Sequence, residues 1–185
     1  MIAIWIASAV AVIIFIVGVT LFNRLIRFKN TVKSAWSDID VQLKKRHDLI
    51  PNLLETVKSY SAYEKNVFEN ITRARSAAMS GIAPGGRAEA EQTLSGLLRG
   101  LFAVAEAYPD LKANQNYLAL QSQLTQVEGD IEHARRYYNA VVRDFNTAIE
   151  SFPSNLIAAA FVFKQAEMFE LGQVEKEKSP SIHFQ

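Results

Sequence analysis

The sequence predicts an all-α fold in which one N-terminal transmembrane helix is followed by an antiparallel bundle of long helices. Two observations predict this. Residues 1–22 contain no charged side chain, and from residue 32 onwards apolar residues recur at alternating spacings of three and four. This spacing gathers apolar residues on one face of a helix. We therefore expect a transmembrane helix (1–22), a basic juxtamembrane segment (23–33), a cytoplasmic helical bundle (34–172) and a loosely ordered C-terminal tail (173–185).

The apolar run is long enough to cross a bilayer as a helix. At 1.5 Å per residue, 22 residues span about 33 Å, against about 30 Å for the hydrocarbon core. A buried helix of a soluble domain is disfavoured, because few globular helices are apolar on every face over this length. A cleaved signal peptide needs a basic start and a small-residue cleavage site after the run. Here no Lys or Arg precedes the run, and Ala7-Ser8-Ala9 lies in its middle, so we expect an uncleaved anchor.

Charges beside the span predict its orientation. The segment from Asn23 to Lys33 holds four basic residues and no acidic one. The positive-inside rule therefore places the N-terminus outside and the large domain in the cytoplasm. The same side chains can meet anionic lipid headgroups at the membrane surface, although topology alone is a sufficient reason for them. These candidate membrane-surface residues are Arg24, Arg27, Lys29 and Lys33.

The clearest helix of the predicted bundle runs from about Asn114 to Ser151, and Pro153 ends it. Its apolar positions keep the three-four spacing for more than four heptads, while charged residues such as Glu128 lie off this seam. The seam consists of Tyr117, Leu120, Leu124, Val127, Ile131, Ala134, Tyr138, Val141, Phe145 and Ala148.

A second seam of the same spacing extends from Val32 to Ala78. Its phase does not slip across Pro51, although proline removes a backbone donor and clashes with the carbonyl four residues earlier. We favour a kinked continuous helix over a tight hairpin near Asp48–Pro51, because only the continuous helix keeps the phase naturally.

Two charged residues, Arg46 and Glu64, occupy positions of this second seam. They lie 18 residues apart, about 27 Å along a helix, and therefore cannot pair with each other. If buried, each needs a partner from another helix or another chain. The alternative is that each long side chain extends to solvent from a partly exposed position.

Shorter elements complete the expected bundle. Residues 80–86 (SGIAPGG) predict a loop, followed by a helix with Ala90, Leu94, Leu97, Leu101 and Val104 on one face. A last helix is expected from about Asn155 to Leu171, capped by Ser154 or Asn155. The long helix at 114–151 would span about 56 Å and the helix before it only about 30 Å. A second copy of the chain would cover the excess seam, so we expect a homo-oligomer. The alternatives are that the first helix bends sharply at Pro51, or that the last helix covers the excess seam with Leu156, Ile157, Phe161 and Phe169.

No residue pattern of a catalytic, metal or cofactor site is found. The chain has no cysteine, and its three histidines lack a His or Cys partner at metal-ligand spacing. Residues 81–86 lack the Lys-Ser/Thr and the preceding strand of a phosphate-binding loop. Without the four juxtamembrane charges, 16 basic residues face 19 acidic ones, a net charge of −3, which argues against nucleic-acid binding. We expect no enzyme activity and no cofactor.

One motif resembles a known family. A basic cluster runs into Asp-Leu-Ile-Pro-Asn-Leu, with Ala35–Asp40 before it and Glu55–Lys58 after it, and this order is similar to that of the LemA family. Further similarities are Glu64, Ala74-Arg75, Tyr137–Asn139 and Phe152–Ala158, so the resemblance covers essentially the whole chain. It departs mainly at the first two motif positions, where arginines are common. The motif residues are Lys44, Lys45, Arg46, His47, Asp48, Leu49, Ile50, Pro51, Asn52 and Leu53.

The resemblance implies a bacterial inner-membrane protein with a short outer start and a helical cytoplasmic domain. No enzymatic activity is established for the family. Relatives are associated with a membrane metalloprotease and with TPM-domain proteins, and some are linked to membrane remodelling, which suggests the kinds of partner. The favoured function is a membrane-anchored scaffold or adaptor that acts through protein contacts. The alternative is a membrane-shaping protein that acts on the bilayer by oligomerisation.

Overall fold

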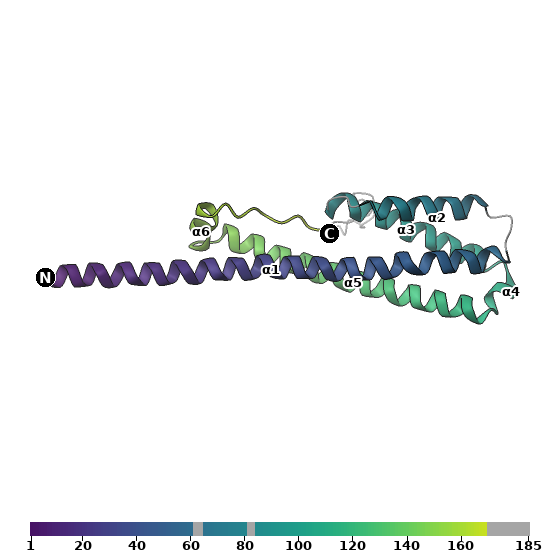
Figure 1. Cartoon of the computed structure of the whole chain (residues 1–185), viewed down its shortest axis with the longest axis horizontal. Helices are drawn as coiled ribbons and strands as arrows, with labels where there is room; N and C mark the ends of the chain where they lie inside the picture. The colour runs from purple at the N-terminus through teal and green to yellow at the C-terminus, as the bar shows by residue number, and fades with distance from the viewer. Residues whose placement is uncertain (61–64, 81–83, 170–185) are drawn as a thin grey trace, which may run out of the picture.

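The computed structural model describes residues 1–60, 65–80 and 84–169, and these form helices and connecting segments without any strand (Figure 1). The predicted all-α class is therefore confirmed. The helices are α1 (Ile2–Lys58), α2 (Lys65–Ala78), α3 (Pro84–Ala105), α4 (Pro109–Lys112), α5 (Gln115–Glu150) and α6 (Ser154–Ala160).

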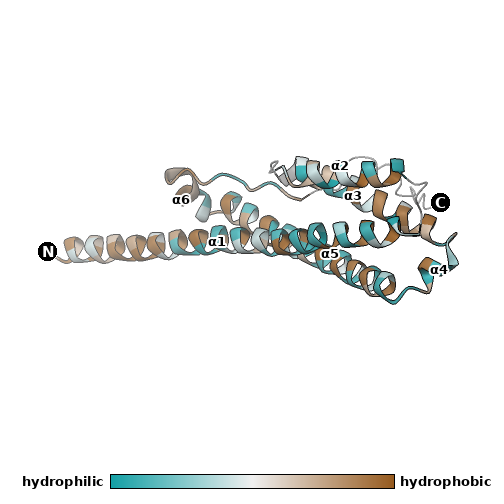
Figure 2. Ribbon diagram, turned by 45° about the vertical axis from the view of Figure 1, so that its right-hand side comes forward, coloured by the Kyte–Doolittle hydropathy of each residue, from teal (hydrophilic) through white to brown (hydrophobic). Residues whose placement is uncertain are grey.

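Helix α1 is one unbroken helix of 57 residues that runs through Pro51. At 1.5 Å per residue it is about 86 Å long. The prediction that the chain continues through Pro51 rather than folding back there is confirmed. Its N-terminal part projects from the bundle and is coloured mostly hydrophobic (Figure 2). None of its most apolar 18-residue window is buried, and by length and composition the helix can cross a membrane.

The second seam does not belong to one helix, and in this respect the prediction was wrong. Helix α1 ends at Lys58, and α2 carries the seam residues from Val67 to Ala78 back alongside it (Figure 1). Apolar spacing records which residues are buried, not whether the helix between them is continuous. Val57 of α1 and Ile71 of α2 are both buried in the same core cluster, so the phase persists although the helix does not.

The core has two parts along the antiparallel pair of α1 and α5. At the end far from the N-terminus, α2 and α3 cover this pair, and the shared cluster includes Leu53, Ile71, Leu101 and Leu124. Helix α5 confirms the predicted long helix, with Asn114 as its N-cap: the Asn114 side chain accepts a hydrogen bond from the Tyr117 amide.

Helix α3 differs from its prediction at its start and in its buried face. It begins at Pro84, so the last three residues of the expected loop are helical. Leu94 and Leu101 are buried as expected, but the rest of the buried face consists of Ala88, Glu91, Leu98 and Ala105, whereas Leu97 is half-buried. The buried face therefore includes the Glu91 carboxylate, which pairs with Arg46 on α1.

The predicted last helix is the largest error. Helix α6 ends at Ala160, neither Ser154 nor Asn155 caps it, and Val162 has a φ of 54°. Residues 163–169, the return segment, then run extended alongside α5 toward the bundle (Figure 1). Phe161, Val162 and Phe163 are poor helix formers, and α5 offers this stretch other hydrogen-bond partners.

Two asparagines of α5 hold the return segment. Asn146 donates to the carbonyl of Ala166 at 3.0 Å and accepts from its amide at 2.9 Å. Asn139 likewise donates to the carbonyl of Phe169 at 3.1 Å and accepts from its amide at 2.8 Å. The Tyr138 hydroxyl donates to the Glu167 carbonyl at 2.8 Å, and burial, with a smaller contribution from the Glu167 charge, raises the pKa of Tyr138.

The return segment covers seam that α2 and α3 do not reach. Phe169 is buried in the second core cluster with Ile39, Leu43, Ile131 and Val142. The excess seam is therefore covered within the chain, but by an extended segment. Of the four residues expected to cover it, Phe169 is buried and Ile157 is partly buried, whereas Leu156 and Phe161 are exposed. The overhang thus no longer argues for a second copy.

Candidate functional site

The charged cluster around Arg46 is the most unusual feature of the bundle interior. Arg46 lies in the C-terminal part of α1 and is only 1% exposed. Its guanidinium forms ion pairs with Glu91 of α3 and, at 2.6 Å, with Glu128 of α5. It also donates to the Ser95 hydroxyl of α3 at 2.6 Å. One side chain therefore joins three helices, and both of its ion-pair partners belong to the same chain.

The carboxylates of this cluster differ in their access to water. The Glu91 side chain is 5% exposed, whereas that of Glu128 is 38% exposed. His47, which follows Arg46, places Nε2 at 3.1 Å from a Glu91 carboxylate oxygen. A buried carboxylate needs such partners because leaving water costs several kcal/mol per ion. Glu91 is therefore the member that depends most on Arg46.

Pro51 leaves a carbonyl without its helical partner, and α2 supplies a replacement. Proline has no amide hydrogen for the carbonyl four residues earlier, which is that of His47. Arg75 Nε donates to the His47 carbonyl at 2.8 Å. Arg75 thus supplies the hydrogen bond that Pro51 cannot, so that α1 stays helical through Pro51 and α2 is fixed against α1.

An outer layer of charges and rings adjoins the cluster on the side of the N-terminus. Arg87 of α3 pairs with Asp40 of α1 at 2.6 Å and lies 5.8 Å from the Trp36 ring. The Trp36 ring also contacts those of Tyr138 and Phe169, with centroids 5.3 and 5.9 Å apart. This layer links α1, α3, α5 and the return segment.

The motif that resembles a family forms one buried face of α1. Arg46, His47, Ile50 and Leu53 are buried, together with the preceding Leu43. The remaining motif residues are exposed, except for half-buried Leu49; the exposed ones are Lys44, Lys45, Asp48, Pro51 and Asn52. The motif therefore specifies internal contacts of the bundle on one face and a polar surface on the other.

The other predicted residues do not join this cluster. Arg24, Arg27, Lys29 and Lys33 are all exposed on α1, near the end of the apolar run. Glu64 lies outside the described residues. In the described part of the chain, no group of three or more His, Asp or Glu side chains could hold a metal ion. The cluster can act as an electrostatic joint between helices.

Sequence reasoning identified Arg46 but missed its partners. Glu91 lies three residues before Leu94, so it continues the seam of α3 through Leu94, Leu98 and Leu101. A charged residue on a seam was the same signal that singled out Arg46. It was overlooked because Ala90, Leu97 and Val104 were assigned to the seam, whereas the residues one position later, Glu91, Leu98 and Ala105, are the buried ones.

Fold and site together define a class of protein: an α-helical bundle, joined by an internal ion-pair cluster, on an apolar N-terminal helix long enough to cross a membrane. Residues 35–184 match the model of the LemA family, and the chain belongs to this family. It is 26% identical to Protein LemA of Metamycoplasma hominis over 155 residues, covering 83% of this chain and 71% of the relative.

Two magnetosome proteins are also similar. The chain is 24% identical to Magnetosome protein MamQ 2 of Paramagnetospirillum magneticum, over 91% of this chain and 72% of the relative. It is 23% identical to Magnetosome protein MamQ of Magnetospirillum gryphiswaldense, over 88% of this chain and 70% of the relative.

Proposed function

We propose that this protein is a single-pass, membrane-anchored scaffold that acts through protein contacts at the cytoplasmic face of the bacterial inner membrane. The observation that carries the proposal is the continuity of α1. The same unbroken helix forms the apolar span and one wall of the bundle. A partner bound to the bundle is therefore held at a set height and orientation, which a flexible linker would not provide.

The joint around Arg46 supports this role. It ties α3 and α5 to α1, the helix that carries the span. Internal charges of this kind add little to stability beyond what apolar side chains supply, but they can fix the register between helices. A scaffold that presents a surface rigidly benefits from a fixed register. The proposed role requires no catalytic residue, and the partners suggested by family resemblance are a membrane protease or a TPM-domain protein.

Capture of partners in membranes tests the proposal. We would cross-link the full-length protein in its native membranes, solubilise it in mild detergent and identify the proteins bound to it. A matched pair of variants separates rigid presentation from simple anchoring. Lys33→Pro interrupts α1 between span and core at an exposed position, whereas Lys33→Ala leaves the helix intact.

The expected result is a defined set of partners that Lys33→Ala retains and Lys33→Pro loses, with both variants still in the membrane. Recovery of the same partners by Lys33→Pro would show that the continuity of α1 is irrelevant. If no protein is retained above a tag-only control, the scaffold proposal is wrong.

A membrane-shaping protein is the second candidate. It is favoured by α6, where Leu156 is exposed and Ile157 lies beside Gly18 in the apolar part of α1. Purified protein added to liposomes separates the two candidates, since tubulation by the protein alone supports membrane shaping. This candidate also requires copies to associate, so sedimentation in detergent should then give a mass of more than one chain.

A further inference from the structure

The connection after α5 exposes an unusual amount of apolar surface. Residues 152–163, the apolar tip, contain no charged side chain. Phe152, Leu156, Phe161 and Val162 are 80%, 60%, 60% and 73% exposed. A contiguous exposed apolar patch marks a surface that meets a membrane or another protein. The other large apolar side chains exposed beyond residue 19 are spread singly over the described part of the chain: Val41, Tyr60, Met79, Leu118 and Tyr137.

The apolar tip lies against the end of the apolar run of α1. The rings of Phe22 and Phe161 have centroids 4.6 Å apart. A Cβ built on Gly18 would lie 3.9 Å from Cδ1 of Ile157. Gly18 is four residues inside the end of the uncharged run, which corresponds to about 6 Å along the helix. When α1 crosses a bilayer, Ile157 therefore lies at the depth of the acyl chains.

Basic residues border the tip on the side of the bundle. Lys164 follows it directly in the sequence, and the Lys29 ammonium lies 6.0 Å from the centroid of the Phe163 ring. Arg24, which lies 5.5 Å from the Phe28 ring, is exposed at a similar level of α1. Apolar side chains ahead of a basic border are typical of segments that insert into the membrane interface.

Val162 gives a further reason to expect lipid around the tip. A β-branched residue at a φ of 54° is strained, by about 1–3 kcal/mol for conformations of this kind. Gly or Asn would adopt this conformation more easily. Valine adds no buried contact that offsets the strain, since it is 73% exposed. An apolar environment outside the chain would bury this exposed side chain and so offset the strain.

We propose that the apolar tip inserts into the cytoplasmic leaflet beside α1, so that the protein contacts the membrane with two segments rather than one. This inference rests on the proposed crossing of the membrane by α1. The occupant of the exposed face is the acyl region of the leaflet that α1 itself enters. Lipid is favoured over a second copy because the tip is continuous with the apolar surface of the span and has a basic border.

Lipid quenching of single fluorescent labels tests the insertion. The chain has no cysteine, so Leu156→Cys and Phe161→Cys each give one labelling site for an environment-sensitive dye. The full-length protein is reconstituted into phosphatidylcholine–phosphatidylglycerol vesicles, with or without spin-labelled lipids. Two controls are matched for exposure: Phe15→Cys, in the run and 72% exposed, and Tyr137→Cys, on α5 and 54% exposed.

Insertion predicts a blue-shifted emission and strong quenching at Leu156 and Phe161, greatest with a spin label placed shallow in the acyl chain. Phe15 should be quenched best by a deeper label, and Tyr137 should not be quenched. Quenching at Phe15 without quenching at Leu156 and Phe161 would overturn the insertion and leave the anchor in place.

Two further outcomes would overturn the insertion. If Phe15 is not quenched, α1 does not cross the membrane, and both the proposed anchoring and the insertion are wrong. If the dye on Leu156→Cys is shielded from water but not quenched by lipid, and the unlabelled variant forms a disulfide with another copy when copper–phenanthroline is added as oxidant, a second chain covers the tip. That result would overturn insertion in favour of self-association.

Discussion

Arg46 is held by charges from two different helices, and neither carboxylate is near it in sequence. Glu91 and Glu128 lie 45 and 82 residues away. The seam on α1 predicted a partner for Arg46 only if the side chain is buried, and its 1% exposure excludes the alternative that it extends to solvent. The partner itself was not predictable, because a carboxylate on α3 and one on α5 become neighbours only after the helices pack. For a single residue, the sequence can therefore indicate that a partner is needed, but it does not identify the partner.

Removing Arg46 should destabilise the bundle more than removing the whole pair. In Arg46→Met, the buried Glu91 carboxylate loses its main counter-charge, and such a loss typically costs about 3–5 kcal/mol. In Arg46→Met/Glu91→Leu no charge of this pair remains buried, so most of that stability should return. Thermal unfolding of the full-length protein in detergent, followed by circular dichroism, measures both variants.

An exposed arginine gives the matched control for this experiment. The Arg136 side chain is 62% exposed and pairs with Glu132 on the same helix, so Arg136→Met should change stability by about 1 kcal/mol or less. A double variant as unstable as Arg46→Met alone would show that the two charges do not act as a pair.

Arg75 and Pro51 should be coupled through a single carbonyl. Arg75→Met removes the donor to the His47 carbonyl, and an unsatisfied buried polar group costs about 1–3 kcal/mol. Pro51→Ala restores an amide hydrogen for that carbonyl. The cost of Arg75→Met should therefore be much smaller in the Pro51→Ala background. Chemical denaturation of the four proteins gives the coupling energy, and equal costs in both backgrounds would refute the link.

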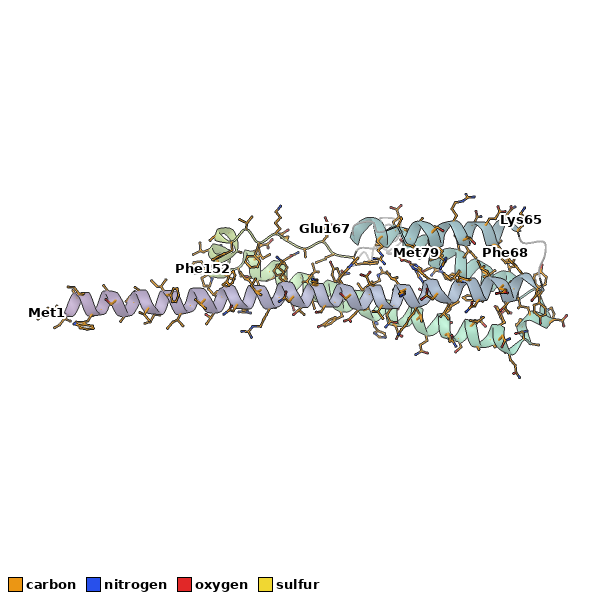
Figure 3. All side chains as sticks on the ribbon, in the orientation of Figure 1. Met1, Lys65, Phe68, Met79, Phe152 and Glu167 are labelled. Carbon is orange, nitrogen blue, oxygen red and sulfur yellow. The ribbon has the colours of Figure 1, made fainter. Side chains whose placement is uncertain are left out.

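At the level of elements, the return segment shows how an extended chain can pack on a helix without a sheet. An asparagine amide offers one donor side and one acceptor, as a backbone peptide does. Asn139 and Asn146 are seven residues apart, about 10.5 Å along α5, and the three residues from Ala166 to Phe169 span about 10 Å when extended. The spacing of the two asparagines along α5 therefore matches the spacing of Ala166 and Phe169 along the return segment, so both pairs of hydrogen bonds form together. Figure 3 labels Phe152 and Glu167, between which the chain turns and runs back toward the bundle.

Removing the side-chain amides of Asn139 and Asn146 should release the return segment but leave α5 folded. In Asn139→Ala/Asn146→Ala, the amides of Ala166 and Phe169 lose their acceptors, so residues 163–169 should exchange amide hydrogens faster, while exchange in the middle of α5 is unchanged. Hydrogen exchange read by mass spectrometry measures this. Asn139→Asp keeps the acceptor for Phe169 and should have a smaller effect. Unchanged exchange at 163–169 in the double variant would mean that the apolar contacts of Phe169 suffice.

The helices were predicted far better than this segment, for a physical reason. Helix α5 carries its own evidence, because ten seam residues repeat over more than four heptads. The stretch from Leu156 to Phe169 also has apolar residues at helical spacing, so it suggested a helix. What decides its conformation is the fit to two asparagines on α5, which is a tertiary contact. In the same way, the break after Lys58 was hidden because α1 and α2 bury their seams in one core.

At the scale of the whole molecule, α1 connects an apolar end to a charged joint. Its first part exposes apolar side chains on every side, its middle carries exposed basic residues, and Arg46 lies buried further along. These three zones were visible in the sequence, because each depends on the local pattern of charge and apolar residues. The side of the membrane on which each zone lies depends on charge relative to the bilayer, and this leads to the last prediction.

The N-terminus should lie outside the membrane and the bundle inside the cytoplasm. Arg24, Arg27, Lys29 and Lys33 all follow the apolar run within eleven residues, and positive charge near a span is retained on the cytoplasmic side. Because the natural chain has no cysteine, single cysteines report accessibility without background. Ala3→Cys lies at the start of the run and Ser37→Cys lies beyond its end, both at exposed positions. A membrane-impermeant maleimide should label Ala3→Cys in intact spheroplasts and Ser37→Cys only after the membrane is opened. The reverse pattern would mean that the charges do not set the orientation, and labelling of both in intact spheroplasts would mean that the run does not cross the membrane.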